Sequence, residues 1–515
     1  MEQEKPNVVL IMCDQMAAHV VGCYGNQPSF TPNIDRLAAN GVRFDRFYCN
    51  SPMCCPSRAS TFSGRYPSDV NVYDNGAAFR ADIPTFVHGL KGSGYRTFLS
   101  GKAHFVGPDQ HHGFDSRLTR EIYPSSFIWT PDWRKPVSLN SGSNVFQLRD
   151  SGECLWSLQM EYDDEVLHHG LRCLREQAKS QAVAKDSQPF FLNISFTHPH
   201  DPFIVTGDYM RRIDHQNVQP PRPDYGDTAD HPYNQWINRH HGLEEAEVTE
   251  EEKLRSRHAY YGACAYIDDC VGAITGEIAR LGLSQSTVVV FASDHGEMLG
   301  EHGMWFKRTY FEEAVRVPFI MSWPGTFVSG RTVETNASLV DLFPTLCEVG
   351  SVKSSFTEVC GLRGTSLVDL AVSGNTQHQK SRVVIVEYLG EGTTEPLRAA
   401  IGDNYKLVTV RNQPSILFDL RNDPFENTNL AESPIHRQRR LELNEALMEQ
   451  WNPESVRASV IASQARRYAI HRAAYAAHPP NWDRIADHTD QGSVIKRNAQ
   501  MESEQNRYPP ADWRT

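Results

Sequence analysis

Four short apolar runs in this 515-residue chain are each followed by polar side chains that can bind metal ions or anions. The runs are Val8–Met12, Thr97–Ser100, Phe190–Phe196 and Val288–Ala292. The polar residues after them are Asp14 and Gln15, Lys102 and His104, His198 and His200, and Asp294 and His295. Because ligands bind at the carboxyl ends of strands in open α/β sheets, four such ends favour one convergent site over four unrelated loops.

Asp14 and Asp294 are the first candidates for metal ligands. Carboxylate oxygens at two strand ends suit a hard cation such as Ca²⁺ or Mg²⁺. An aspartate after a strand is also common as a loop cap. Here, however, the two residues end separate apolar runs and are followed by Gln15 and by His295-Gly296. This arrangement favours the metal interpretation.

A helix is expected to begin near Cys54. Pro56 suits the first turn of a helix, and Gly64 lies where this helix would end. Residue 54 would then lie at a helix N-terminus, where backbone amides and the helix dipole favour anions.

The segments that carry these residues predict an α/β fold. Because β-branched runs alternate with helical stretches, we expect a central, mostly parallel sheet flanked by helices in residues 1–375. Residues 376–450 are predicted to form a smaller C-terminal α+β subdomain with an antiparallel sheet. Its expected strands are Val383–Glu387, Lys406–Val410 and Ile416–Leu420. Residues 451–515 are expected to form a tail, helical and then extended, that could pack on a neighbouring subunit.

Composition and charge limit the compartment and the partners. The formal net charge of −12 gives no global reason to bind nucleic acid or an anionic membrane, so an anionic substrate needs a local positive site. No apolar stretch is long enough for a signal peptide or a membrane span. The eleven cysteines are scattered and odd in number, unlike a disulfide framework. We expect a cytoplasmic protein that binds neither nucleic acid nor membrane.

The stretch from Cys54 to Gly64, CCPSRASTFSG, resembles the signature of the formylglycine-dependent sulfatases, which belong to the alkaline phosphatase superfamily. In that signature the first cysteine is oxidised to formylglycine. Thr31–Ala38 and Leu417–Pro424 are similar to further stretches of the family. The resemblance implies an alkaline-phosphatase-like fold and a sulfuric ester hydrolase. The alternative, that Cys54 is only a buried thiol, is disfavoured because its neighbours are those that the conversion needs.

The resemblance also implies a role for each polar residue. A hydrated aldehyde at residue 54, bound to a divalent metal, would attack sulfur and expel the alcohol. The implied metal ligands are Asp14, Gln15, Cys54, Asp294 and His295, with Ca²⁺ expected and Mg²⁺ or Mn²⁺ as alternatives. The implied catalytic residues are Cys54, Arg58, Lys102, His104, His200 and Lys307. His200 and Lys307 would hold the sulfate and protonate the leaving oxygen. The implied partner for maturation is a formylglycine-generating enzyme.

A narrower resemblance, to choline sulfatases, rests on Gly101–Gly113 (GKAHFVGPDQHHG), Trp129–Trp133 (WTPDW) and Phe196–Pro202 (FTHPHDP). In that subfamily a tryptophan, an acidic residue and a carboxylate from a neighbouring subunit enclose a trimethylammonium group, as a quaternary cation requires. The matching substrate-binding positions are Asn75, Trp129, Glu387 and Asp490. The resemblance implies choline-O-sulfate as the leading substrate and a homo-oligomer, either a dimer or a tetramer.

Several alternatives stay open. Lys135–Asp150 and the residues before Phe79 differ from the choline-sulfatase pattern, so another small alkyl or aryl sulfate is possible as the substrate. A phosphonate monoester hydrolase or phosphodiesterase on the same fold is a second alternative, because sulfate and phosphate are both tetrahedral. Trp129 could serve packing alone. A noncatalytic, metal-containing scaffold protein is disfavoured because the whole set of polar residues is present.

Overall fold

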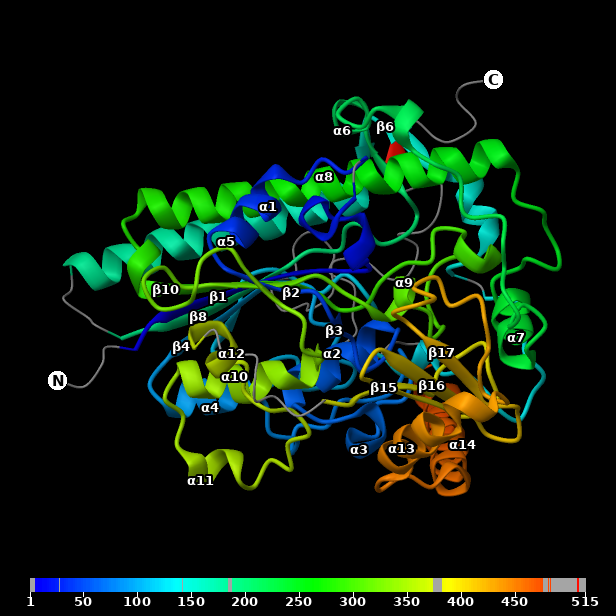
Figure 1. Cartoon of the computed structure of the whole chain (residues 1–515). Coiled ribbons are helices and arrows are strands. Elements are labelled where there is room, and N and C mark those ends of the chain that lie inside the picture. Colours follow the sequence, from blue (N-terminus) through cyan, green and yellow to red (C-terminus); the bar gives the residue numbers. More distant parts are fainter. Residues whose placement is uncertain are drawn as a thin grey trace.

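Two sheets organise the chain in the computed structural model, one of eight strands and one of four antiparallel strands (Figure 1). The structure describes residues 5–26, 28–140, 142–183, 188–373, 382–475, 480, 482 and 507–508.

The large sheet is mostly parallel. Its strands, in spatial order, are β12 (Arg331–Val333), β2 (Val42–Phe44), β11 (Phe319–Ser322), β10 (Thr287–Ser293), β1 (Asn7–Cys13), β8 (Phe190–Ser195), β4 (Arg96–Gly101) and β5 (Ser116–Arg117). β1 pairs in parallel with β10 and β8, and β4 pairs in parallel with β8 and β5. Only β11 runs antiparallel to its two neighbours among these described strands. The four apolar runs are strands β1, β4, β8 and β10, and the predicted α/β fold is confirmed.

Helices cover both faces of this sheet, as the alternation along β1 shows. Val8 and Leu10 pack into one hydrophobic core, whereas Val9 and Ile11 pack into another, because successive strand residues point to opposite faces. The helices of the first core are α2 (Cys54–Ser63), α4 (Phe86–Gly92), α10 (Leu342–Val349), α11 (Ser354–Thr357) and α12 (Val368–Val372). The helices of the second are α1 (Pro32–Ala39), α5 (Leu158–Val183), α6 (Gly207–Met210) and α8 (Glu250–Arg280), on the opposite side of the sheet (Figure 1).

The small sheet has its own core. Its strands are β14 (Val384–Tyr388), β15 (Leu397–Gly402), β16 (Tyr405–Val410) and β17 (Ile416–Asp419), each antiparallel to the next. They pack against α13 (Arg437–Met448) and α14 (Pro453–Ile470). The three predicted strands are confirmed to within one residue at each end. β15 was not predicted, because its sequence LRAAIG combines arginine and small residues of weak β propensity.

Short elements complete the described chain. The helices are α3 (Pro67–Val70), α7 (Pro232–His240) and α9 (Glu312–Val315). Three ribbons pair β3 (Phe47–Tyr48) with β13 (Ala337–Ser338), β6 (Gly152–Cys154) with β9 (Ile204–Thr206), and β7 (Trp156–Ser157) with β18 (Arg507–Tyr508). None of the described helices combines the length and the apolar character that crossing a bilayer requires.

Candidate active site

The register of two parallel strands brings Asp14 and Asp294 together. β1 ends at Cys13 and β10 ends at Ser293, and these two residues are partners across the sheet. Each aspartate is the next residue along its chain segment, and both are fully buried. The backbone amide of Asp294 donates to the carbonyl oxygen of Cys13 over 3.3 Å. The sheet itself therefore places the two carboxylates side by side.

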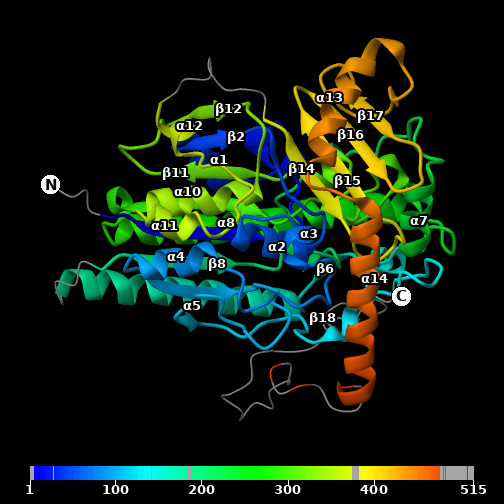
Figure 2. The ribbon, with the colours of Figure 1, turned by 90° about the horizontal axis from the view of Figure 1, so that it is seen from below.

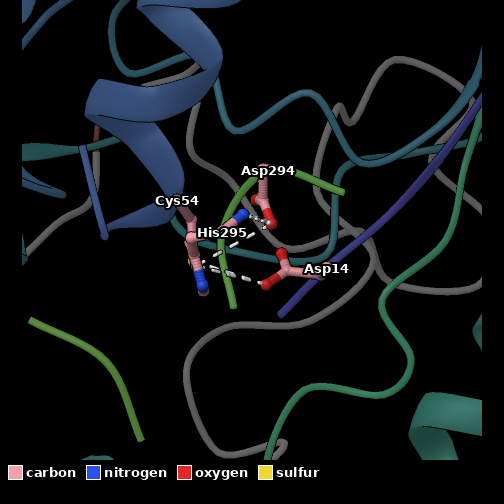
Figure 3. A group of neighbouring side chains, drawn as sticks. All are labelled: Asp14, Cys54, Asp294 and His295. Atoms are coloured by element: carbon pink, nitrogen blue, oxygen red, sulfur yellow. Dashed lines mark hydrogen bonds and ion pairs between the residues drawn. The ribbon is translucent and has the colours of Figure 1, made fainter. Parts of the chain in front are cut away.

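Four side chains form a cluster at this edge of the sheet (Figure 3). Their ligand atoms all lie within 4.8 Å of one another, and the residues are Asp14, Cys54, Asp294 and His295. His295 Nδ1 is 3.0 Å from the carbonyl oxygen of Gly296, so this nitrogen is the donor and the lone pair of Nε2 faces the cluster. Burial lowers the pKa of His295 to about 4, which keeps the imidazole neutral. Two carboxylates and a neutral imidazole can hold a divalent cation.

Cys54 begins α2, a helix whose ten residues are all buried. The helix ends at Gly64, which adopts the left-handed conformation with a φ of 66°, so the predicted start and end of this helix are confirmed. The Sγ atom of Cys54 lies 3.2 Å from His295 Nε2 and 3.6 Å from Asp14 Oδ1. The helix therefore presents the thiol, from its first turn, to the proposed metal ligands.

Arg58 is one turn further along α2 and ties the strand ends together. Its Nε donates to Asp294 Oδ2 over 2.8 Å, and its Nη2 donates to Asp14 Oδ2 over 3.3 Å. Its Nη1 donates to the carbonyl oxygen of Lys102 over 2.8 Å and to Ser195 Oγ over 2.9 Å. The ion pairs to both carboxylates raise the pKa of Arg58 against the opposing effect of burial. One buried guanidinium thus joins the ends of four neighbouring strands.

Lys102 and His104 follow β4 and lie against Tyr123. The Nζ of Lys102 donates to Asp14 Oδ2 and lies 4.1 Å from the centre of the Tyr123 ring. His104 stacks on the same ring, with 5.2 Å between centroids. Neither ring nitrogen of His104 has a hydrogen-bond partner in the described chain, and burial lowers its pKa well below the usual value. His104 is therefore neutral and free to contact a ligand.

His200 and Lys307 form a direct pair. Lys307 Nζ lies 2.6 Å from His200 Nε2, and His200 Nδ1 donates to the carbonyl oxygen of Asp201 over 2.6 Å. Lys307 Nζ also donates to Gln15 Oε1. The Gln15 amide nitrogen donates to Asp201 Oδ1 over 3.0 Å and to Glu297 Oε2 over 2.5 Å. Gln15 therefore lies beside the cluster, and its side chain is hydrogen-bonded to Lys307, Asp201 and Glu297.

His198, in contrast, is turned away from the site. Its Nδ1 lies 2.6 Å from Asp163 Oδ2, and Asp163 also accepts hydrogen bonds from the backbone amides of Thr197 and His198. These contacts hold the loop that carries His200, so His198 has a structural role in this loop.

A cavity of about 430 Å³ opens above these residues. The catalytic candidates that line it are Cys54, His104, His200 and Lys307. The predicted substrate residues Asn75 and Trp129 also line it. The Trp129 ring lies 5.8 Å from that of His104 and 5.4 Å from that of Tyr123, measured between centroids. An aromatic wall thus stands directly beside the catalytic candidates.

Glu387 does not line this cavity, contrary to the prediction. It is fully buried, where its carboxylate accepts from the backbone amide and hydroxyl of Ser68, over 3.0 and 2.9 Å, and pairs with Arg398 Nε at 3.3 Å. Two acidic residues do line the cavity, Asp132 and Glu391, and Glu391 lies a few residues after β14. Asp490 lies outside the described residues.

Comparison with known proteins identifies the family. Residues 6–352 match the family model described as "Sulfatase", and residues 300–452 match the one described as "N-sulphoglucosamine sulphohydrolase, C-terminal". The chain belongs to the sulfatase family. The sulfatase is 37% identical to the choline-sulfatase of Rhizobium meliloti over 479 residues, which cover 91% of each chain. It is 27% identical to the uncharacterized sulfatase YidJ of Escherichia coli, over 87% of each chain. The predicted sulfuric ester hydrolase is thereby confirmed.

Solved structures support the same fold for this sulfatase. A 2-O GAG sulfatase has a TM-score of 0.69 and 22% identity, and the match covers 91% of this chain and 94% of that one. The phosphonate monoester hydrolase of Agrobacterium radiobacter has a TM-score of 0.68 and 23% identity, and the match covers 88% of this chain and 96% of that one.

Three residues of the site were not predicted from the sequence. Tyr123 contacts Lys102 and His104, but it follows no predicted strand, and although Ile122-Tyr123-Pro124 is similar to the choline-sulfatase pattern, no role was predicted for it. Arg308 donates to Glu391 Oε1 over 2.8 Å, and both residues line the cavity. Glu391 stands between two glycines a few residues after the predicted strand Val383–Glu387, a signal that could have identified it.

Proposed function

We propose that this sulfatase hydrolyses a small, cationic sulfate ester, with choline-O-sulfate as the leading substrate, and that Cys54 is oxidised to formylglycine. The observation that carries the proposal is the position of residue 54. It lies in the cluster with Asp14, Asp294 and His295 and also at the floor of the cavity. The hydrate of the aldehyde would supply a hydroxyl nucleophile at this position.

The chemistry of the donors fits a divalent cation, for which we propose Ca²⁺, with Mg²⁺ or Mn²⁺ as alternatives. Asp14, Asp294 and His295, together with residue 54, are the proposed ligands. Gln15 is the proposed additional ligand, because its backbone amide donates to Asp294 Oδ1 over 3.1 Å and keeps it at the edge of the cluster. When bound, the cation would stabilise negative charge on the nucleophile and on the sulfate oxygens.

The remaining polar residues balance charge and transfer protons on the two sides of the substrate's sulfur atom. Arg58 and Lys102 neutralise the buried carboxylates, and neutral His104 can accept a proton from the hydroxyl at residue 54. On the other side, Lys307 and His200 face the cavity as a hydrogen-bonded pair. We propose that this pair holds a sulfate oxygen and delivers the proton to the leaving alcohol.

The walls of the cavity support a cation on the alcohol part of the substrate. Trp129 offers an aromatic face, and Glu391 offers a carboxylate whose Oε2 is buried without a hydrogen-bond partner in the described chain. An aromatic ring and an unpaired carboxylate oxygen are what a quaternary ammonium group needs. Because Trp129 is next to His104, the linker between sulfate and cation must be short. The choline-sulfatase relative is consistent with this substrate.

A phosphonate monoester hydrolase is the alternative, favoured by one of the solved structures that shares the fold. The test is a comparison of kcat/KM for choline-O-sulfate, an aryl sulfate and a phosphonate monoester. The protein is co-produced with a formylglycine-generating enzyme, and mass spectrometry of the peptide with residue 54 verifies the aldehyde. We expect the highest value for choline-O-sulfate. A phosphonate preference would overturn the proposed substrate, and an unconverted thiol in fully active protein would overturn the proposed nucleophile.

The compartment and the assembly are part of the proposal. All eleven cysteines are free, which suits a reducing compartment, and we propose the cytoplasm. We also propose a homo-oligomer, a dimer or a tetramer, in which Asp490 of one subunit completes the cation site of another. Neither nucleic acid nor a membrane is a proposed partner, in keeping with the net charge of −12.

A further inference from the structure

Helix α14 buries polar side chains on the face that it turns toward the protein. Its buried residues are Val460, Gln464 and Arg467, which the helical spacing of four and three residues places on one face. Arg467 is only 5% exposed, and Gln464 is completely buried. Because arginine and glutamine are rarely buried without partners, this face must be matched by specific acceptors.

Arg467 joins two loops that line the cavity. Its two Nη atoms donate to the two carboxylate oxygens of Asp74, each over 2.7 Å, in a bidentate ion pair. Its Nη1 also donates to Thr130 Oγ1 over 2.8 Å. Asp74 precedes Asn75 and Thr130 follows Trp129, and both of these neighbours line the cavity. One guanidinium therefore fixes the loop that carries Asn75 relative to the loop that carries Trp129.

Gln464, one turn earlier on α14, connects a third segment. Its Oε1 accepts from the backbone amide of Trp133 over 2.9 Å. The indole Nε1 of Trp133 in turn donates to the carbonyl oxygen of Gly390 over 2.8 Å, next to Glu391. The three segments that hold Asn75, Trp129 and Glu391 thus meet at a single helix.

α14 lies outside the residues that the two family models cover together. The two matches together end at residue 452, and α14 begins at Pro453. The catalytic candidates all lie before this limit, and Arg467 contacts none of them among the hydrogen bonds of the described residues. Figure 2 shows α14 as a long helix that runs from the small sheet along the side of the molecule. It is therefore placed to shape the substrate wall without touching the sulfate machinery.

We propose that Arg467 is a positioning residue that sets substrate specificity, because it holds the loops of Asn75 and Trp129 against the alcohol part of the substrate. This proposal rests on the proposed function for the identity of the substrate. It assigns to α14 the role of fixing the cavity wall, while the proposed catalytic residues come from α2 and from loops at the edge of the large sheet.

The test uses Arg467→Lys in the full-length, aldehyde-containing enzyme. Lysine keeps the charge but cannot form the bidentate pair with Asp74 and the bond to Thr130 at once. We expect KM for choline-O-sulfate to rise about tenfold with kcat within about twofold. For ethyl sulfate, which lacks the trimethylammonium group, we expect kcat/KM to change less than about twofold. An equal loss for both substrates, or no loss for either, would overturn the proposal.

A second measurement separates this proposal from the proposed function. Hydrogen exchange of the amides in residues 129–133 should become about tenfold faster in Arg467→Lys, since the contacts that hold the loop are weakened. If the wild-type enzyme hydrolysed neither sulfate ester, the proposed function would fail, and exchange alone would decide on the role of Arg467. Unchanged exchange in this loop would then overturn it.

Two further variants guard against a general loss of structure. Arg466→Lys alters the exposed neighbour of Arg467 on the same helix and should change neither the kinetics nor the exchange. Gln464→Met keeps a similar side-chain volume and removes only the acceptor for the Trp133 amide. This variant replaces Arg467→Lys in the test if Arg467→Lys does not fold. We expect faster exchange at Trp133 and a higher KM for choline-O-sulfate. A wild-type result for Gln464→Met would contradict the role of α14.

Discussion

Buried charges at the sheet edge are balanced by Arg58 and Lys102. Arg58 forms ion pairs of 2.8 and 3.3 Å with Asp294 and Asp14, and all of these side chains are fully buried. Because an unpaired buried charge costs several kcal/mol, removing one of these residues would damage the fold together with the activity. Cys54 is different, because its thiol is not part of the salt-bridge network. It is the position at which chemistry can be removed without disturbing the charge balance.

We expect Cys54→Ala to abolish turnover and to leave the fold intact. Loss of the nucleophile should lower kcat by about 10⁴-fold or more, whereas the loss of one small polar group from the side chain should cost only about 1 kcal/mol of stability. Activity assays and urea titration measure the two effects. Cys55→Ala is the matched control, since the Cys55 Sγ is turned toward the Ala77 carbonyl oxygen, 3.9 Å away. Substantial activity in Cys54→Ala would contradict the mechanism.

The two acidic residues in and after β14 should differ in their effect on KM. Glu391→Gln removes the charge at the cavity and weakens the pair with Arg308, so stability should fall and KM for choline-O-sulfate should rise about tenfold, with little change in KM for 3,3-dimethylbutyl sulfate, whose alcohol part is a neutral isostere. Glu387→Gln breaks the buried pair with Arg398 and should cost about 3 kcal/mol of stability with an unchanged KM. Steady-state kinetics and thermal melting distinguish them. The reverse pattern would restore Glu387 as the substrate residue.

At the scale of elements, the strand ends could be predicted from the sequence, but the loops that form the cavity walls could not. β-branched runs predicted β1, β4, β8 and β10, and polar residues at their ends marked the cluster in advance. The wall depends on loops whose course the strand pattern does not fix. Period-two alternation places Glu387 on one face of β14, but it cannot tell which face meets the cavity or that Glu391 folds back to it. Arg467 reaches Asp74 across the fold, a contact that no local pattern indicates.

The end of β4 depends on a glycine, which gives a prediction about this element. Gly101 has a φ of 105°, and a Cβ atom there would lie 1.9 Å from the carbonyl oxygen of Ser195. We expect Gly101→Ala to cost about 3 kcal/mol or more and to lower kcat, because the neighbouring Lys102 would be displaced. Chemical denaturation and activity assays test both effects.

Gly276→Ala provides the contrasting control for this strand. Gly276 lies on the exposed side of α8, with no atom within 4 Å of an added Cβ. Alanine there should raise stability by about 0.5–1 kcal/mol and leave activity unchanged, because it favours the helix. If the two glycine variants had equal stability, close packing at the end of β4 would not be what positions Lys102.

At the scale of the whole molecule, the site is assembled from both sheets. The strand ends of the large sheet supply Asp14, Asp294 and His295, which are proposed metal ligands, whereas the loop after β14 of the small sheet supplies Glu391, which Arg308 holds at 2.8 Å. α14 then links the walls through Arg467. A cavity lined by residues from both sheets can also accept a side chain from another subunit at its opening. The proposed contribution of Asp490 from a partner would extend the same principle beyond one chain.

Mixing two defective variants tests this shared site. Cys54→Ala lacks the nucleophile but retains Asp490, and Asp490→Asn retains the nucleophile but lacks the carboxylate. If Asp490 acts in trans within a dimer, a mixed dimer contains one complete site, so an equal, randomly assorted mixture should recover about a quarter of the wild-type kcat/KM for choline-O-sulfate. If Asp490 acts within its own chain, mixing restores nothing, because every site still lacks one of the two groups. Co-expression followed by light scattering confirms that mixed oligomers have formed, and a fully active monomer would exclude a shared site.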